Sequence, residues 1–83
     1  MFYTVKVFKS KGGVKMINPN KVKGYRNMLG LTQEQMGEKL GITKQTYHNK
    51  EIGKNSFSDK EKMTFKQLLL PIFPNITIED IFF

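Results

Sequence analysis

The sequence predicts an all-α domain of five short helices, preceded by a short N-terminal extension. One observation is that helix-capping signatures recur along residues 17–83 too closely for another fold class. A second is that glycines and prolines fall where the predicted helices should end. The third is a pair of capped segments, residues 32–40 and 43–51, that a glycine turn separates.

Each predicted helix begins at a residue whose side chain can accept a hydrogen bond from the helix's first N–H groups. The five N-caps are Asn18, Thr32, Thr43, Ser58 and Thr77. Pro19 follows the first cap, where its missing N–H costs nothing. Gly30 and Gly41 are expected to end the first two helices, and Pro71 and Pro74 the fourth.

Apolar residues of the fourth helix repeat at the spacing of a single helix face. They are Phe65, Leu68, Leu69 and Ile72. The C-terminal end is also too apolar to be left in water, through Ile78, Ile81, Phe82 and Phe83. These four residues are expected either to complete the core under the fourth helix or to form a dimer interface, and both interpretations stay open.

The composition of the 83 residues argues against several kinds of functional site. There is no cysteine, so the chain offers neither a disulfide nor a thiolate metal site. With a single histidine and no clustered acidic residues, we expect no metal and no cofactor. No nucleophile, base and orienting group come together, so an enzyme is not expected. No apolar run exceeds three residues, which predicts no membrane span.

The basic charge fits a polyanionic partner, but its distribution weakens that inference. Fourteen basic and seven acidic residues give a formal net charge of +7, and basic side chains that displace counterions from phosphates gain affinity. Four lysines and no acidic residue lie within residues 1–15. More than half of the excess charge therefore lies outside the predicted helices.

Residues 1–15 differ from the helical body and have two open interpretations. Residues 3–7 alternate between apolar and polar, as in an edge strand or short hairpin, unless the extension is disordered. Alternatively, the extension is an artefact of start-site choice, because the Gly-Gly pair before Met16 can be encoded by a purine-rich ribosome-binding sequence. We favour Met16 as the natural initiator, with residues 16–83 as the DNA-binding domain argued below.

The most informative segment is residues 31–54, where two short helices meet at a tight turn. Gly41 can adopt the left-handed conformation that such a turn needs. Gly37 lies one helical turn earlier, and a larger side chain there would push the next helix away. A chance pair of antiparallel helices could carry the same caps, but the spacing of the two glycines favours a helix-turn-helix motif.

The second helix of this motif begins with polar side chains that suit the reading of DNA. Gln45 and Asn49 lie one turn apart on the same face, and both amides can bond the edge of adenine. Lys44 can donate to guanine, and Thr46 can offer its methyl group to thymine or simply pack. Such residues are also common on solvated helices, so their position directly after the turn is what favours base contact.

These residues carry a resemblance to a known family. Residues 18–83 resemble the phage repressor and Cro family of helix-turn-helix regulators, the xenobiotic-response-element type. The matching sequence is RNMLGLTQEQMGEKLGITKQTYHNKEIGK. More narrowly, the segment TYHNKE, the glycine, lysine and Phe57 that follow, and the Ile-Phe-Phe end are similar to small repressors of phages and mobile elements in low-GC Gram-positive bacteria. The resemblance implies a five-helix, lambda-repressor-like fold.

The resemblance also implies roles for particular residues. In the family, the first residues of the recognition helix and one a turn later touch bases, which corresponds to Lys44, Gln45 and Asn49. The first residue of the preceding helix, here Gln33, binds a phosphate at the helix N-terminus. Further contacts with the DNA backbone are expected from His48, Lys54 and Asn55.

Family members pair an arginine of the first helix with a glutamate that ends the recognition helix. Here these are Arg26 and Glu51, and we expect a partly buried ion pair that fixes the two helices together. Tyr47 and Lys50 depart from the family, which has apolar residues at both positions. Tyr47 is expected to fill the space with its ring and direct its hydroxyl outward, and Lys50 to snorkel or to mark a shorter helix.

The sequence therefore predicts a Cro-like or repressor-like regulator of transcription that inserts residues 44–51 into the major groove of a double-stranded DNA operator. A homodimer on a two-fold operator is expected. Such a protein would be cytoplasmic and associated with the nucleoid. The alternative is an antitoxin or another protein-interaction module on the same scaffold. RNA binding is a weaker reading, because the chain lacks aromatic stacking platforms on a strand face.

Overall fold

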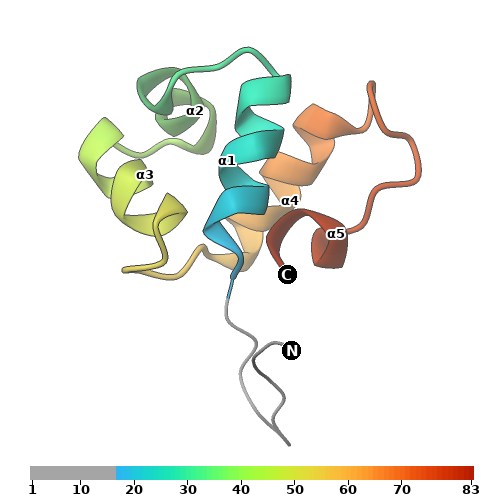
Figure 1. The fold of residues 1–83 in the computed structure, drawn as a ribbon. Helices are drawn as coiled ribbons and strands as arrows, with labels where there is room; N and C mark the ends of the chain where they lie inside the picture. Colours follow the sequence, from blue (N-terminus) through green and yellow to red (C-terminus); the bar gives the residue numbers. More distant parts are fainter. Residues whose placement is uncertain (1–16) are drawn as a thin grey trace, which may run out of the picture.

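The computed structural model describes residues 17–83 as five helices without a strand (Figure 1). The helices are α1 (Pro19–Met28), α2 (Gln33–Leu40), α3 (Lys44–Glu51), α4 (Asp59–Leu69) and α5 (Ile78–Phe82). The all-α fold class is thereby confirmed. The expectations of an edge strand, of disorder or of an unnatural start within residues 1–15 lie outside the described residues.

All five predicted N-caps accept hydrogen bonds from the first turn of their helices. Three of them form complete capping boxes, in which the third helical residue bonds back to the cap's own N–H. The pairs are Thr32 with Gln35, Ser58 with Glu61, and Thr77 with Asp80. The helix starts are therefore fixed by local hydrogen bonds that the sequence alone specifies.

Helix α1 lies in the middle of the fold, between the α2–α3 pair and the α4–α5 pair (Figure 1). It contacts both α3 and α5. The backbone N–H of Asn18 donates to the carbonyl of Phe82 at 2.7 Å, which ties the start of α1 to the end of α5. Helix α1 therefore connects α2 and α3, the predicted helix-turn-helix, to α4 and α5.

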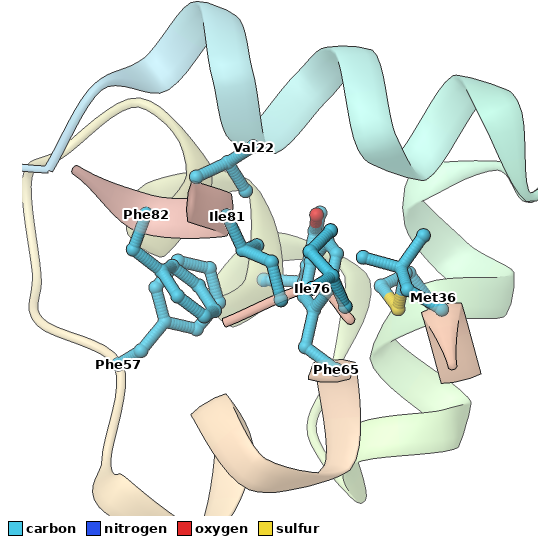
Figure 2. Packing of buried hydrophobic residues seen from close by; sticks show 9 residues of the cluster. Val22, Met36, Phe57, Phe65, Ile76, Ile81 and Phe82 are labelled. Carbon is cyan, nitrogen blue, oxygen red and sulfur yellow. The ribbon is translucent and has the colours of Figure 1, made fainter. Parts of the chain in front are cut away.

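The hydrophobic core draws on every helix and on the loops that flank α4 (Figure 2). Its buried members are Val22, Met36, Tyr47, Phe57, Phe65, Leu69, Ile76, Ile81 and Phe82. Phe82 lies 5.1 Å from Phe57 and 5.4 Å from Phe65 between ring centroids. Edge-to-face and tilted ring pairs of this kind add to the stability that burial gives.

The apolar C-terminal end divides between core and surface. Ile81 and Phe82 are fully buried, so they complete the core and cannot also present a dimer interface. Ile78 and Phe83 are half-buried and pack against the core. Ile81 and Phe82 therefore belong to the core, and only Ile78 and Phe83 remain candidates for a dimer interface.

One residue of the apolar face expected for α4 lies elsewhere. Ile72 falls beyond the end of α4 and its side chain is 49% exposed. Pro71, which has no N–H to continue the helix, turns the chain away at this point. Phe73, half-buried, packs edge-on against Tyr25 instead, at 6.0 Å between centroids. No helix in residues 17–83 is long and apolar enough to cross a membrane.

Candidate nucleic-acid interface

The turn between α2 and α3 sets how the two helices meet. Gly41 has a φ of 77°, the left-handed conformation expected for it. The N–H of Ile42 donates to the carbonyl of Gly37 at 2.9 Å. A Cβ atom on Gly37 would lie only 2.9 Å from the carbonyl oxygen of Ile42 and 3.2 Å from that of Thr43. The chain that leads into α3 therefore packs directly on the backbone of α2.

The start of α3 presents an exposed polar face. Lys44 and Gln45 are exposed, and Asn49 is half-buried. The side-chain amide of Gln45 donates to Oδ1 of Asn49 at 3.1 Å, so the two amides are already aligned with each other. Thr46 is half-buried, and its hydroxyl accepts from that of Thr43 at 2.9 Å. Thr46 is accordingly tied to the cap of α3.

The acidic residue of α3 is removed from this face. Glu51 is only 3% exposed, and the first turn of α3 holds no acidic residue. A carboxylate on the exposed side would repel phosphates at close range, where screening by salt is weakest. The outward side of α3 therefore presents lysine, amide and imidazole groups and no carboxylate.

Glu51 is the centre of a hydrogen-bond network that joins three helices. Arg26 of α1 donates from Nε to Oε2 at 2.7 Å and from Nη2 to Oε1 at 3.3 Å. Gln33 of α2 donates from Nε2 to Oε1 at 3.0 Å, and the hydroxyl of Tyr47 donates to Oε2 at 2.7 Å. Arg26 also donates to the carbonyl of Leu31 at 2.8 Å. The structure thus brings the expected ion pair together and adds two neutral donors to it.

The ionised form of Glu51 is favoured in spite of its burial. Burial alone would raise the pKa of Glu51, but the hydrogen bonds from Arg26, Gln33 and Tyr47 and the arginine's charge outweigh it, so the pKa falls below the ordinary value of 4.5. The Glu51 hydrogen bond likewise raises the pKa of Arg26. Burial first, and then the bond to Glu51, raises the pKa of Tyr47. The network therefore consists of a carboxylate, a guanidinium and a neutral phenol.

We expect the fold to lose stability in acid because of Glu51. A carboxylate whose pKa is lower in the folded chain stabilises the fold above its unfolded pKa, and this contribution disappears as the pH falls through the folded pKa. The free energy of unfolding should hardly change between about pH 8 and pH 6. It should decrease once the pH falls below 4.5, the ordinary pKa of a glutamate. Urea denaturation over a pH series measures this, and a midpoint that stays constant into strong acid would contradict it.

Two expectations for the recognition helix were wrong or incomplete. Tyr47 does not direct its hydroxyl outward: the side chain is fully buried and the hydroxyl bonds Glu51. Lys50 neither snorkels freely nor marks an early helix end, because α3 continues to Glu51. Its Nζ lies 2.6 Å from Oε1 of Glu61, which also accepts the N–H of Ser58. This pair ties α3 to the first turn of α4.

The residues expected to contact phosphates fall into two groups. Lys54 and Asn55 are exposed in the loop after α3, and their backbone N–H groups donate to the carbonyl of Asn49 at 2.9 and 3.1 Å. Gln33 and His48 are half-buried and face each other, with 3.2 Å between Nε2 of Gln33 and Nδ1 of His48. The side chain of Gln33 is thus engaged within the protein.

One spacing in the sequence hints at the partners on the inward side of α3. Tyr47 and Glu51 are four residues apart, a spacing that puts both on one helix face. Gln33 and Glu61 lie 18 and 11 positions from their partners Glu51 and Lys50. No local pattern links residues so far apart in the chain, so only the packing of the helices reveals these contacts. Within residues 17–83, no group of three acidic, histidine or cysteine side chains is placed to hold a metal ion.

Comparison with known proteins agrees with this geometry. Residues 22–61 match the family model described as helix-turn-helix, a span that holds α2, α3 and most of α1. The chain is 41% identical over 63 residues to an uncharacterized HTH-type transcriptional regulator of Methanocaldococcus jannaschii, MJ0272. The alignment covers 76% of this chain and 88% of that relative. No solved structure gives a significant match. The chain therefore belongs to the helix-turn-helix family of DNA-binding transcription regulators.

Proposed function

We propose that the protein is a sequence-specific, Cro-like or repressor-like regulator that inserts α3 into the major groove of its operator. The observation that carries the proposal is the exposed face of Lys44, Gln45 and Asn49 at the start of α3, with the helix's carboxylate turned inward. A helix bound in this way reads bases with the side chains of its first turns. Thr46 would contribute a methyl contact at the edge of that face.

Contacts with the DNA backbone would fix the register of α3 without reading sequence. Lys54 and Asn55 are suited to this role, because they are exposed and follow directly after the recognition helix. His48 flanks the same face. The Gln33 side chain is less suited to it, since its amide nitrogen already has two partners.

We further propose that the protein acts as a homodimer on a two-fold operator. A single small module buries limited surface on DNA, so two copies on half-sites about one helical turn apart give the affinity that a regulator needs. Ile78 and Phe83, which are half-buried, are the C-terminal residues that remain candidates for the contact between copies. The resemblance to repressors of phages and mobile elements supports a negative regulator on such an element.

Selection of binding sites from random duplexes tests these proposals. The wild-type protein should enrich a two-fold motif, and Gln45→Ala should lose preference at one base position of each half-site by about 1–3 kcal/mol. Gln67→Ala, on the exposed side of α4, is the matched control and should leave the motif unchanged. A motif that survives Gln45→Ala, or no enrichment with the wild type, would overturn the assignment of α3.

A further inference from the structure

We propose that Gln33 is a positioning residue that keeps the proton of neutral His48 on Nε2, so that the imidazole presents an N–H donor to a DNA phosphate beside α3. The proton's position follows from the protein alone. The phosphate contact rests on the proposed function. The hydrogen bonds that support the proposal run from Arg26 through Glu51 and Gln33 to His48.

The first step is the orientation of the Gln33 amide. The charge and hydrogen bonds of Arg26 keep Glu51 ionised, and an ionised carboxylate only accepts hydrogen bonds. The atom of Gln33 that lies 3.0 Å from Oε1 of Glu51 must therefore be the amide nitrogen and not the oxygen. The choice between the two ends of the amide, which often is ambiguous, is decided here by the partner.

The second step is the protonation of the imidazole. The same amide nitrogen lies 3.2 Å from Nδ1 of His48, and an amide N–H₂ group can only donate. Nδ1 must accept, so it carries no proton. In a neutral imidazole one nitrogen donates and the other accepts, which leaves the proton on Nε2.

The third step concerns what remains to meet DNA. Both hydrogens of the Gln33 amide are engaged, one with Glu51 and one with His48. Its side chain has no donor left for a phosphate, and its free oxygen would repel one. Within residues 17–83, Nε2 of His48 has no hydrogen-bond partner, and the residue is half-buried next to Asn49 and one turn after Lys44. The group available to donate to a phosphate is therefore Nε2 of His48 and not the amide of Gln33.

Nitrogen-15 NMR of the free, untagged protein tests the proton's position directly. The chain has a single histidine, so the ring signals need no assignment among several residues. At about pH 8, where an ordinary imidazole is neutral, Nε2 should have the chemical shift of a protonated ring nitrogen and Nδ1 that of a bare one. A proton found on Nδ1 in the wild type overturns the proposal without any variant.

The role of Gln33 is tested by Gln33→Met, which keeps the side chain's length and removes its donor. Both ring shifts should move toward the exchange average of free imidazole, while Gln67→Met, the same change on the exposed side of α4, leaves them where they are. Thermal melting checks that both variants fold. Ring shifts in folded Gln33→Met that match the wild type would show that Gln33 does not hold the proton.

The phosphate contact is tested with the selected operator at about pH 8, where an ordinary imidazole is neutral. His48→Ala should weaken binding roughly 2- to 10-fold, as the loss of one hydrogen bond does. The slope of log affinity against log salt should not change, because a neutral donor displaces no counterion. Lys54→Ala provides the contrast and should lower that slope by about 1.

The outcomes separate the two proposals. Unchanged affinity in His48→Ala, or a smaller salt slope like that of Lys54→Ala, overturns the neutral phosphate contact. If the wild-type protein binds no duplex, the proposed function fails and the phosphate contact fails with it. The NMR result still decides whether Gln33 fixes the proton on His48, because that measurement uses no DNA.

Discussion

Glu51→Ala is expected to lower the free energy of unfolding by about 3–5 kcal/mol, a large part of what a domain of this size has. Arg26 is 8% exposed and would keep its charge with neither hydrogen bond to a carboxylate. The amide of Gln33 and the hydroxyl of Tyr47 would lose the same acceptor. The free energy of unfolding therefore falls because one buried charge is left unpaired and two hydrogen-bond donors are left without an acceptor.

Urea denaturation measures the loss, and two further variants identify its cause. Glu38→Ala removes an exposed glutamate of α2 and should change stability by no more than about 0.5 kcal/mol. The double variant Arg26→Met with Glu51→Met removes both charges and should recover much of the loss, since an apolar pair can replace a buried ion pair at little cost. Glu51→Ala with the wild-type denaturation midpoint would mean that the network is not structural.

Gly37→Ala is expected to destabilise the fold by about 1–3 kcal/mol and to weaken operator binding. The new Cβ atom would lie 2.9 Å from the carbonyl oxygen of Ile42 and 3.2 Å from that of Thr43. Both are backbone atoms of the turn, so relief requires that α3 moves relative to α2. A shifted recognition helix meets its bases in the wrong register, and the affinity falls along with the stability.

The matched control is Gly24→Ala in the middle of α1. An added Cβ there has no atom within 4 Å, and α1 is an ordinary helix at that position. The usual gain of about 0.5–1 kcal/mol from replacing a helical glycine by alanine should appear. The two substitutions are thus expected to change the denaturation midpoint in opposite directions. A gain at both positions would show that α3 does not need the close approach at Gly37.

The parts of the fold that depend on near neighbours in the chain could be predicted from the sequence. A cap and the helix that follows it are neighbours in the chain, which is why the five helix starts were predicted. The end of α4 was foreseen as well, but the apolar spacing wrongly extended its buried face to Ile72. Periodicity continues past a proline in the sequence, whereas the backbone does not.

The contacts on the buried side of α3 could not be predicted from the sequence in the same way. The departure of Tyr47 from an apolar pattern was visible, but its hydroxyl was expected to face solvent, because its acceptor Glu51 is presented only when α1 and α2 pack against α3. The Lys50–Glu61 pair and the two partners of Gln33 are contacts between helices. No spacing rule within one helix predicts them.

The two sides of α3 hold separate sets of residues, and this separation bears on how such a regulator could diversify. Lys44 and Gln45 are exposed and Tyr47 and Glu51 are buried. Substitutions at the exposed positions leave the core and the Glu51 network intact, so a lineage can change its operator preference without first repairing its fold. Copies of the gene could then diverge toward different operators in single mutational steps.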